Sequence, residues 1–369
     1  MRFLSFLAVL VCASATCLAQ GSYDVHSNGS ITFHLTAPGA KAVELGLEGA
    51  AKPLPMTRDA SGIWSVTTEK LAPEIYGYSF TVDGVRQLDP LSTDARDNYI
   101  FLWNNVLVPG TTPEPWELQA IPHGAVTHHV FTTKNVEGLP AGQEDYYVYT
   151  PPGYDPRRVE AYPVLYLLHG WSDKANAWTA AGHADRILDT LIDAGKAKPM
   201  VVVMPLGYGT MHTLQRGKDL KTLLYQNTGG FSRVLLEEVM PQVERAYHVR
   251  RDRNGRAIAG LSMGGLESVT VGLAHTERFA WIGSFSGAFL QSAPPTITPE
   301  QAKLRLLWIA CGTEDGLLND NRTEITGLKQ KGFTVNTVET PGMHTWMVWR
   351  DNLIHFAPLL FKQTAAKGE

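Results

Sequence analysis

The chain has 369 residues, 44% of them hydrophobic and 18% charged, so it can bury large cores and is not a disordered chain. At roughly 150 residues per domain, this length predicts two or three domains. The net charge is −4, which offers no electrostatic attraction for nucleic acid or an anionic membrane, and three cysteines exclude a disulfide-stapled scaffold.

Residues 1–19 have the pattern of a signal peptide. Arg2 supplies one positive charge, residues 3–15 form an apolar run too short for a membrane span, and the small residues Cys17 and Ala19 precede the expected cleavage site. The residues before the two leader cysteines are not small, which disfavours a lipoprotein. We expect export to the periplasm or the cell exterior, no membrane association after cleavage, and a mature chain whose only cysteine is Cys311.

Residues 24–108 predict a β-sandwich. Apolar and polar residues alternate over 31–35, 43–47 and 76–82, and Asp83-Gly84 is a strong hairpin-turn signal. No helical periodicity occurs in this stretch, and the strands are short, as in two-sheet sandwiches.

Residues 109–125 are rich in proline and glycine, which disfavours both helix and strand interiors. We expect a linker that packs against one or both of its neighbours.

Residues 126–364 have a different hydrophobic pattern, in which apolar runs alternate with longer amphipathic segments. This alternation predicts a doubly wound, mostly parallel α/β sheet of the α/β hydrolase type, covered on both faces. The expected strands are Tyr162–Leu168, Met200–Met204, Ala257–Ala259, Trp281–Phe285, Leu306–Ala310 and Thr334–Val338. The expected helices are 183–194, 231–247, 263–274, 319–330 and 346–361.

The segment Gly260-Leu261-Ser262-Met263-Gly264 is a G-x-S-x-G motif between a predicted strand and a predicted helix. Such a sharp turn needs glycines beside the serine, because side chains there would clash, and it lifts the hydroxyl above the sheet edge. The competing interpretation is a glycine-rich connection with an incidental serine. We predict that Ser262 is a nucleophile.

A serine nucleophile needs a base and an acid, which this fold supplies in the chain order serine, acid, histidine. Asp315 follows a predicted strand and is our candidate acid, with Glu314 and Asp320 as alternatives. His344 follows the last strand and is our candidate base, oriented by Asp315, although it could be an ordinary loop histidine.

The oxyanion of the tetrahedral intermediate needs backbone N–H donors. Met263, directly after the nucleophile, is one candidate, and Gly170 or Trp171 in the His-Gly loop after an early strand is the second. We expect His169 to hold this loop rather than to act as a second base.

Several tryptophans lie where substrate could stack on them. Trp171, Trp178 and Trp346 are near the predicted catalytic loops and are tentative substrate-binding residues, although Trp178 fits a core role better. Trp103 is a weak candidate for carbohydrate binding, and Trp64 is expected in the sandwich core. The scattered histidines predict no metal site. No glycine-rich phosphate loop is apparent either, because the glycines at 260–265 enclose the serine, so we expect no cofactor.

The hydrolase half resembles carbohydrate esterase family 1, which contains feruloyl and acetyl xylan esterases and is related to the esterase D and enterochelin esterase groups. The resemblance rests on YTPPGY at 149–154, YLLHG at 166–170, DRILD at 185–189, GKAKP at 195–199, AIAGLSMGG at 257–265 and GMHTWMVWR at 342–350. The first 110 residues resemble carbohydrate-binding module family 48, an immunoglobulin-like early set domain, through FHLTAP at 33–38, GIWS at 62–65 and YGYSFTVDG at 76–84. Many relatives have Gly-Gly shortly after His-Gly, whereas Trp171 stands here.

The resemblance places the family's nucleophile on Ser262, its acid on Asp315 and its base on His344. It implies a secreted serine carboxylic ester hydrolase that acts on plant cell-wall polysaccharide, first of all a feruloyl esterase. The expected partner is a polysaccharide ester or a small aromatic ester. The alternatives are an acetyl xylan esterase, an enterochelin-type siderophore esterase, an acyltransferase to a sugar and an inactive carbohydrate-binding relative.

Overall fold

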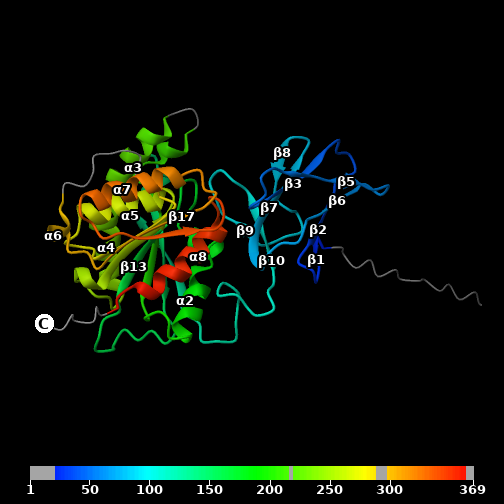
Figure 1. The fold of residues 1–369 in the computed structure, drawn as a ribbon. Coiled ribbons are helices and arrows are strands. Elements are labelled where there is room, and N and C mark those ends of the chain that lie inside the picture. Colours follow the sequence, from blue (N-terminus) through cyan, green and yellow to red (C-terminus); the bar gives the residue numbers. More distant parts are fainter. Residues whose placement is uncertain (1–20, 216–218, 288–296, 363–369) are drawn as a thin grey trace, which may run out of the picture.

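The computed structural model describes residues 21–215, 219–287 and 297–362, so the expected signal peptide lies outside the described residues. The chain forms two lobes that lie side by side (Figure 1). We call residues 21–108 the sandwich lobe and residues 125–362 the hydrolase lobe. Within the described residues, no helix has the length and hydrophobicity needed to cross a lipid bilayer.

Two antiparallel sheets build the sandwich lobe, with strand orders β1-β2-β6-β5 and β4-β3-β7-β10-β9, and β8 pairs with β7. The strands of the first sheet are β1 (Tyr23–Val25), β2 (Ile31–Thr36), β5 (Thr57–Arg58) and β6 (Ile63–Thr67). Those of the second are β3 (Val43–Leu47), β4 (Leu54–Pro55), β7 (Glu74–Val82), β8 (Val85–Gln87), β9 (Ala95–Arg96) and β10 (Trp103–Val108).

Alternation along these strands places the core between the two sheets. Phe33 of one sheet packs with Leu45 and Tyr78 of the other, and all three are fully buried. Trp64 is also buried there, and its indole N–H donates to the Ala37 carbonyl oxygen at 2.9 Å, which confirms its predicted core position. The alternation in the sequence therefore corresponds to the buried faces of a sandwich.

The hydrolase lobe contains one eight-stranded sheet in the order β11-β12-β14-β13-β15-β16-β17-β18. Its strands are β11 (Ala125–Thr132), β12 (Gln143–Thr150), β13 (Val164–Leu168), β14 (Val201–Pro205), β15 (Arg256–Leu261), β16 (Trp281–Phe285), β17 (Leu306–Gly312) and β18 (Asn336–Thr340). The β11–β12 and β12–β14 pairs are antiparallel and the others are parallel. The fold is therefore of the α/β hydrolase type.

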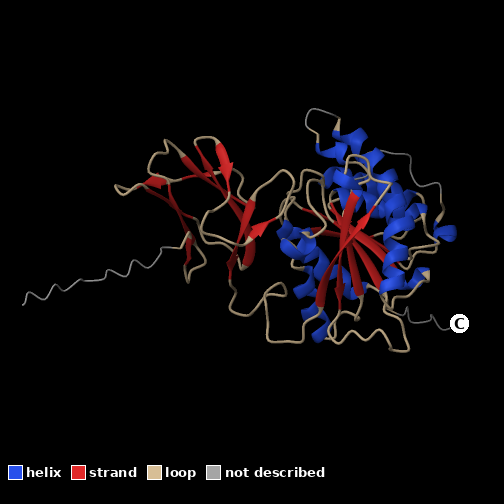
Figure 2. Ribbon diagram, turned by 180° about the vertical axis from the view of Figure 1, so that it is seen from behind, coloured by secondary structure: helices blue, strands red, loops and turns tan. Residues whose placement is uncertain are grey.

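Helices cover both faces of this sheet, as Figure 2 shows. They are α1 (Ala177–Ala180), α2 (Ala184–Asp193), α3 (Leu220–Arg233), α4 (Met240–Ala246), α5 (Met263–Ala274), α6 (Pro299–Ala302), α7 (Leu318–Gln330) and α8 (Trp346–Phe356). A π-helix, Val234–Val239, joins α3 to α4. The 3₁₀ turns are Pro140–Gly142, Met211–Leu214, Arg253–Gly255 and Ala357–Leu359.

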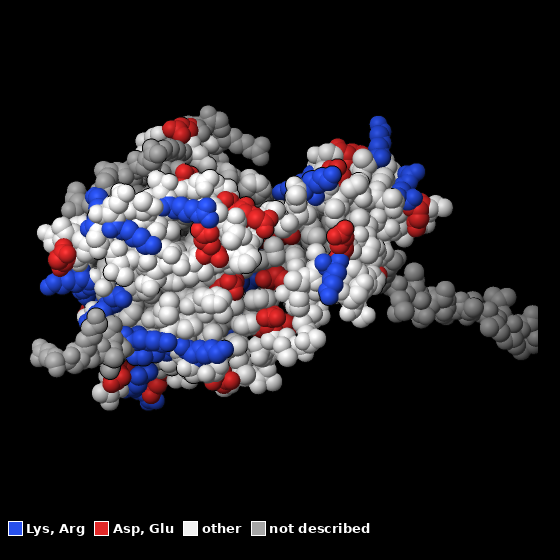
Figure 3. Space-filling model, viewed as in Figure 1, with Lys and Arg blue, Asp and Glu red and all other residues white. Residues whose placement is uncertain are grey.

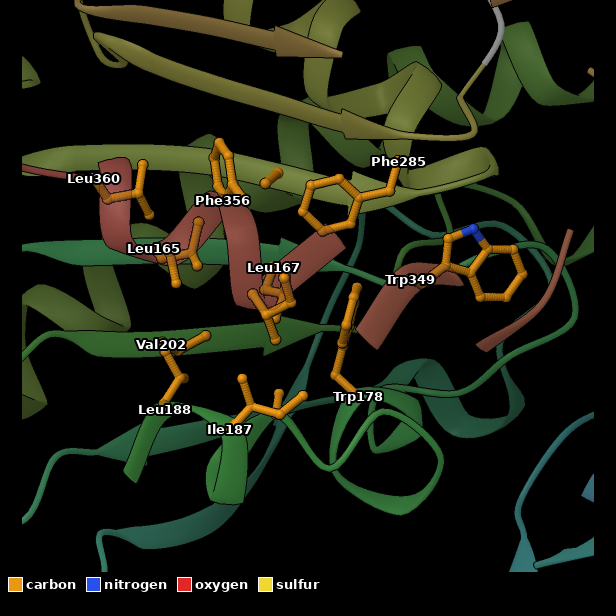
Figure 4. Packing of buried hydrophobic residues seen from close by; sticks show 14 of the residues in the cluster. Leu165, Leu167, Trp178, Ile187, Leu188, Val202, Phe285, Trp349, Phe356 and Leu360 are labelled. Atoms are coloured by element: carbon orange, nitrogen blue, oxygen red, sulfur yellow. The ribbon is translucent and has the colours of Figure 1, made fainter. Parts of the chain in front are cut away.

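The central strands are apolar throughout because each of their faces has its own core. Leu165 and Leu167 of β13 pack with Trp178 and helices α2 and α8 on one face (Figure 4). Val164, Tyr166 and Leu168 of the same strand pack on the opposite face. This arrangement confirms the prediction of a sheet covered on both sides.

The largest differences between the structure and the sequence prediction concern β11 and β12, the helix expected over 231–247, and the end of α8. Strands β11 and β12 were not predicted, since β11 is an exposed edge strand without an apolar run. The helix expected over 231–247 begins earlier, at Leu220, and contains the π-helix. Helix α8 ends at Phe356 instead of residue 361, because Pro358, which cannot continue an α-helix, lies in the 3₁₀ turn Ala357–Leu359.

The segment between the lobes, residues 109–124, packs against the hydrolase lobe and forms hydrogen bonds with it. Trp116 is buried, the Thr190 hydroxyl donates to the Pro115 carbonyl oxygen at 3.2 Å, and the Gly124 N–H donates to Asp189 at 2.9 Å. These contacts fix the path of the proline-rich chain beside α2.

Candidate active site

Ser262 lies at the turn between the end of β15 and the start of α5. Its backbone has φ 51° and ψ −114°, a conformation that costs a non-glycine residue about 1–3 kcal/mol and that the surrounding structure must impose. A Cβ added at Gly264 would lie 2.5 Å from the His169 carbonyl oxygen, and one at Gly260 would lie 2.6 Å from the Gly264 carbonyl oxygen. The glycines that flank the serine are therefore required by packing.

Three side chains from three separate loops form one hydrogen-bonded chain. The Ser262 hydroxyl lies 2.9 Å from His344 Nε2, and His344 Nδ1 lies 2.8 Å from Asp315 Oδ2. Because a carboxylate only accepts, Nδ1 carries the proton and Nε2 is free to accept from the serine. The structure thus brings together the three residues that the sequence singled out.

Asp315 is held by the loop after β17, where its side chain is fully buried. Its Oδ1 accepts the Leu317 N–H at 2.8 Å. Burial raises the pKa of Asp315, but the hydrogen bond and charge of His344 outweigh burial and keep this pKa below its ordinary value. The alternative acids Glu314 and Asp320 are exposed and make no hydrogen bond to His344.

The predicted oxyanion donors lie on both sides of the serine. Met263 is the first residue of α5, where a helix leaves its N–H groups without intrahelical partners. Gly170 approaches so closely that a Cβ there would lie 3.4 Å from Ser262 Cβ. Trp171 follows, and its indole N–H donates to the Thr213 carbonyl oxygen at 2.8 Å, which fixes the ring.

His169 lies beneath this loop as a buried neutral imidazole. Its Nδ1 donates to the Gly170 carbonyl oxygen at 2.8 Å, and its Nε2 accepts the Gly207 N–H at 2.8 Å. Burial lowers the pKa of His169 to about 4, so the ring is uncharged at neutral pH. These contacts match the predicted structural role in holding the loop.

A cleft of about 580 Å³ opens around Ser262, within the usual range for ligand sites of roughly 300–1,000 Å³. Both lobes line it. The hydrolase lobe contributes residues that include Gly170, Trp171, Ser262, His344, Trp346 and Trp349. The sandwich lobe contributes Glu48, Arg96, Asn98, Phe101 and Trp103, among others. The sequence could not indicate this shared wall, because residues of separate domains carry no signal of how the domains pack.

The aromatic predictions have mixed outcomes. Trp171 and Trp346 line the cleft, although Trp346 is only 6% exposed. The prediction of Trp178 as a substrate-binding residue is wrong, because its side chain is fully buried and its N–H donates to the Leu168 carbonyl oxygen at 2.9 Å. Trp349 is also buried but lines the cleft and packs edge-on against His344 at 4.9 Å between ring centroids.

Two aromatic residues of the sandwich lobe face the same cleft. Phe101 is 38% exposed and meets Trp171 edge-on, with ring centroids 6.3 Å apart. Trp103, predicted for carbohydrate binding, forms part of the cleft wall, and the Arg86 guanidinium lies 5.1 Å from its ring. The sequence offered no signal for Phe101.

The charges around the cleft are mostly acidic or paired. Arg96 forms an ion pair with Glu48 at 2.7 Å, and Lys174 pairs with Asp97 at 2.5 Å. Arg350 is fully buried and paired with Glu74, so it is not available to an anionic substrate. On the face that Figure 3 shows, acidic side chains gather near the boundary of the lobes.

Among the described residues, no group of three or more histidine, cysteine, aspartate or glutamate side chains could hold a metal ion. Cys311 is buried without a disulfide, and burial raises the pKa of its thiol to about 12, so it is not a reactive thiolate.

The fold and the Ser262–His344–Asp315 chain define a protein of the α/β hydrolase class. The family model described as "Putative esterase" matches residues 142–360. The chain belongs to this esterase family.

Two relatives extend this comparison. Endo-1,4-beta-xylanase/feruloyl esterase from Xylanibacter ruminicola is 31% identical over 353 residues, which cover 92% of this chain and 46% of that protein. This chain therefore spans about half the length of that relative. Acetyl esterase from Caldicellulosiruptor saccharolyticus is 20% identical over 223 residues, covering 50% of this chain and 78% of the relative.

Solved structures share the fold. A ferulic acid esterase from Anaeromyces mucronatus matches with a TM-score of 0.58 at 21% identity, over 68% of this chain and 96% of its own. The enterobactin esterase from Shigella flexneri matches with a TM-score of 0.67 at 16% identity, over 89% of this chain and 92% of its own. The second likeness extends over both lobes.

Proposed function

We propose that this protein is a serine carboxylic ester hydrolase whose substrate is an aromatic acyl ester of plant cell-wall polysaccharide, as in feruloyl esterases. One observation carries the chemistry: Ser262, His344 and Asp315 are joined by hydrogen bonds of 2.9 and 2.8 Å at the floor of an open cleft. This arrangement is the one that activates a serine hydroxyl, which is a weak nucleophile on its own.

In the acylation step, Ser262 Oγ attacks the ester carbonyl carbon while His344 Nε2 takes the hydroxyl proton. Asp315 stays ionised, holds the proton on Nδ1 and stabilises the imidazolium. The tetrahedral intermediate then collapses, His344 returns its proton to the departing alkoxide, and the alcohol leaves. The acyl group remains esterified to Ser262.

The developing oxyanion is stabilised by backbone N–H groups, one from Met263 and the second from Gly170 or Trp171. The N-terminus of α5 adds its partial positive charge to this site. Water then attacks the acyl-enzyme with His344 as base, which releases the acid and restores the serine.

The aromatic acyl group is supported by the wall that Phe101, Trp103 and Trp171 form beside the serine. A flat phenolic ring gains contact area against such side chains. The relative with 31% identity bears the name xylanase/feruloyl esterase, which supports the same substrate class.

The alternatives fit less well. An acetyl group would leave the aromatic wall without a role. A catecholate siderophore is strongly anionic, whereas Glu48, Asp97, Asp173 and Glu314 line this cleft and Arg96 is already paired. Transfer of the acyl group to a sugar uses the same acyl-enzyme and is separated by its products. Export by an N-terminal signal peptide remains part of the proposal, since polysaccharide substrates lie outside the cell.

A substrate panel tests this proposal. Methyl ferulate, methyl caffeate, acetylated xylan and a catecholate siderophore ester are assayed with the parent, Ser262→Ala and Thr323→Ala, a control that removes an exposed hydroxyl on α7. We expect the hydroxycinnamate esters to be hydrolysed best, Ser262→Ala to lower kcat by about 10⁴-fold or more, and the control to match the parent. Acetylated xylan as the best substrate would contradict the acyl assignment, and an acylated sugar as the main product would favour transfer.

A further inference from the structure

Helix α8 begins two residues after His344 and has no N-terminal cap of its own. Thr345 occupies the cap position, but its side chain accepts no hydrogen bond from the first turn. The first N–H groups of a helix need partners from elsewhere, because no carbonyl of the same helix reaches them. The structure supplies one from the other lobe.

Glu48, just past the end of β3 in the sandwich lobe, provides this partner. Its Oε1 accepts the Trp346 N–H at 3.0 Å, while Oε2 accepts the Gly77 N–H at 2.8 Å and pairs with Arg96 at 2.7 Å. Burial raises the pKa of Glu48, but Arg96, Arg350 and the Gly77 N–H together outweigh burial and keep this pKa below its ordinary value. An ionised carboxylate thus lies at the positive end of α8.

The same face of α8 is attached to the sandwich lobe at two further points. Met347 packs against the sandwich core. Its Cε lies so close to Gly49 that a Cβ added there would be 2.9 Å from it. Arg350, one turn further, bonds to the carboxylate of Glu74 and to the Ile75 carbonyl oxygen of β7. The helix that follows the histidine is therefore anchored on the other lobe over its first two turns.

A second attachment reaches residues 169–173, which contain the predicted donors Gly170 and Trp171 and which we call the oxyanion loop. Asn98 Nδ2 donates to Asp173 Oδ1 at 2.7 Å and to Ser172 Oγ at 3.2 Å, and the Tyr99 N–H donates to the Ser172 carbonyl oxygen at 2.9 Å. Ser172 directly follows Trp171 and has a positive φ of 71°, which an isolated serine rarely adopts. The sandwich lobe thus holds the residue after a predicted oxyanion donor.

We propose that the sandwich lobe is a part of the catalytic frame, with Glu48 as a positioning residue for His344 and Asn98 as a positioning residue for the oxyanion loop. This inference rests on the proposed ester hydrolysis at Ser262. The attachments act on the two groups that must move least during the reaction, the base and the oxyanion donors. Small displacements of such groups lower kcat more than they weaken substrate binding, since a shift of about 1 Å can lower the reaction rate roughly 10²-fold.

The test compares Glu48→Ala, Glu48→Gln and Asn98→Ala with Glu44→Gln, a matched control on β3 whose side chain is exposed. Glutamine keeps one oxygen that can accept the Trp346 N–H, but its amide NH2 then faces the Gly77 N–H and the Arg96 guanidinium. Alanine keeps no acceptor at all. We expect Glu48→Ala and Asn98→Ala to lower kcat by about 10- to 100-fold with KM changed less than about 3-fold. Glu48→Gln is expected to lower kcat less than Glu48→Ala does, since it keeps one acceptor for the Trp346 N–H, and the control is expected to match the parent.

Active-site titration with a fluorophosphonate separates positioning from folding. Each variant is expected to be labelled to completion, although more slowly, which shows that all of its active sites are folded. The kcat divided by the number of labelled sites is expected to be lower than in the parent. Parental kcat per labelled site in both alanine variants would overturn the inference, and so would equal loss in Glu48→Gln and Glu48→Ala. If Glu48→Ala does not fold, Asn98→Ala carries the same test. A parent that neither labels nor hydrolyses esters would instead overturn the proposed function.

Discussion

At the scale of single residues, the turn that holds Ser262 depends on glycines whose surroundings have no room for a side chain, not even a methyl group. Gly264 lies against the backbone of the oxyanion loop, since a Cβ there would meet the His169 and Leu168 carbonyl oxygens at 2.5 and 2.7 Å. Backbone atoms cannot move aside as the end of a flexible side chain can. The motif is therefore a packing requirement as well as a catalytic signature.

Gly264→Ala is expected to lower the free energy of unfolding by about 3 kcal/mol or more and to reduce esterase activity, because the added methyl group must push the oxyanion loop away. Urea denaturation followed by tryptophan fluorescence measures this change. Gly327→Ala is the matched control: it lies in helix α7 with no atom within 4 Å of the added Cβ, and should gain about 0.5–1 kcal/mol. Equal stability of Gly264→Ala and the parent would contradict the packing argument.

At the scale of elements, strand β12 contains a buried carboxyl without a partner. Glu144 is 1% exposed, and neither carboxyl oxygen has a hydrogen-bond partner among the described residues. Burial, with smaller contributions from Glu238 and Asp145, raises the pKa of Glu144 from 4.5 to about 9. The folded chain therefore binds this proton more tightly than the unfolded chain does.

This binding predicts a pH dependence of stability. Between about pH 4.5 and 9 the folded state holds the Glu144 proton and the unfolded state releases it, so the free energy of unfolding falls as pH rises. Glu144→Gln removes the titrating group and is expected to flatten this slope and to stabilise the protein at pH 7 by on the order of 2 kcal/mol. Chemical denaturation at several pH values measures both effects. Glu160→Gln, at a largely exposed position, is the control, and an unchanged slope in Glu144→Gln would refute the prediction.

At the scale of the whole molecule, the two lobes are joined by a buried ion pair. Arg350 of α8 is fully buried and bonds to Glu74 of β7, with the Trp116 ring of the connecting segment 5.8 Å from its guanidinium carbon. Burial raises the pKa of Glu74 to about 7 despite the nearby guanidinium. Contacts of this kind couple the unfolding of the lobes.

Arg350→Met is expected to lower the free energy of unfolding by about 3 kcal/mol, since it leaves Glu74 and two carbonyl oxygens buried without their donor. The parent is expected to unfold in a single transition, and Arg350→Met is expected to unfold in two, one for each lobe. Differential scanning calorimetry measures both. Arg322→Met, in the exposed pair with Glu339, should change little, and an unaltered single transition in Arg350→Met would argue against coupled lobes.

Local patterns in the sequence were enough to predict much of this molecule. Continuous apolar runs predicted the parallel strands, and the glycines around Ser262 predicted the turn, because both features are determined by neighbouring residues. Strand β11 was missed because an exposed edge strand has no apolar run. The tentative substrate-binding role of Trp178 is wrong and its favoured core role is confirmed, since proximity to a catalytic loop in sequence does not determine the direction of a side chain.

The contacts between the two lobes could not be predicted from the sequence. Glu48 and Asn98 are ordinary polar residues of a sandwich until packing places them against α8 and the oxyanion loop. Trp103 likewise gains a position in the cleft wall only through the arrangement of the lobes. Such contacts depend on how the two lobes pack, which local patterns in the sequence do not predict.

The central claim is that Ser262 is the nucleophile of an ester hydrolase, and the acyl-enzyme tests it most directly. The parent is mixed rapidly with methyl ferulate, quenched in acid and digested, and the peptide that contains Ser262 is examined by mass spectrometry. We expect a feruloyl adduct on Ser262 that is absent from Ser262→Ala, whose kcat is lower by about 10⁴-fold or more. Hydrolysis by Ser262→Ala at a rate near that of the parent, or an adduct on another residue, would contradict this claim.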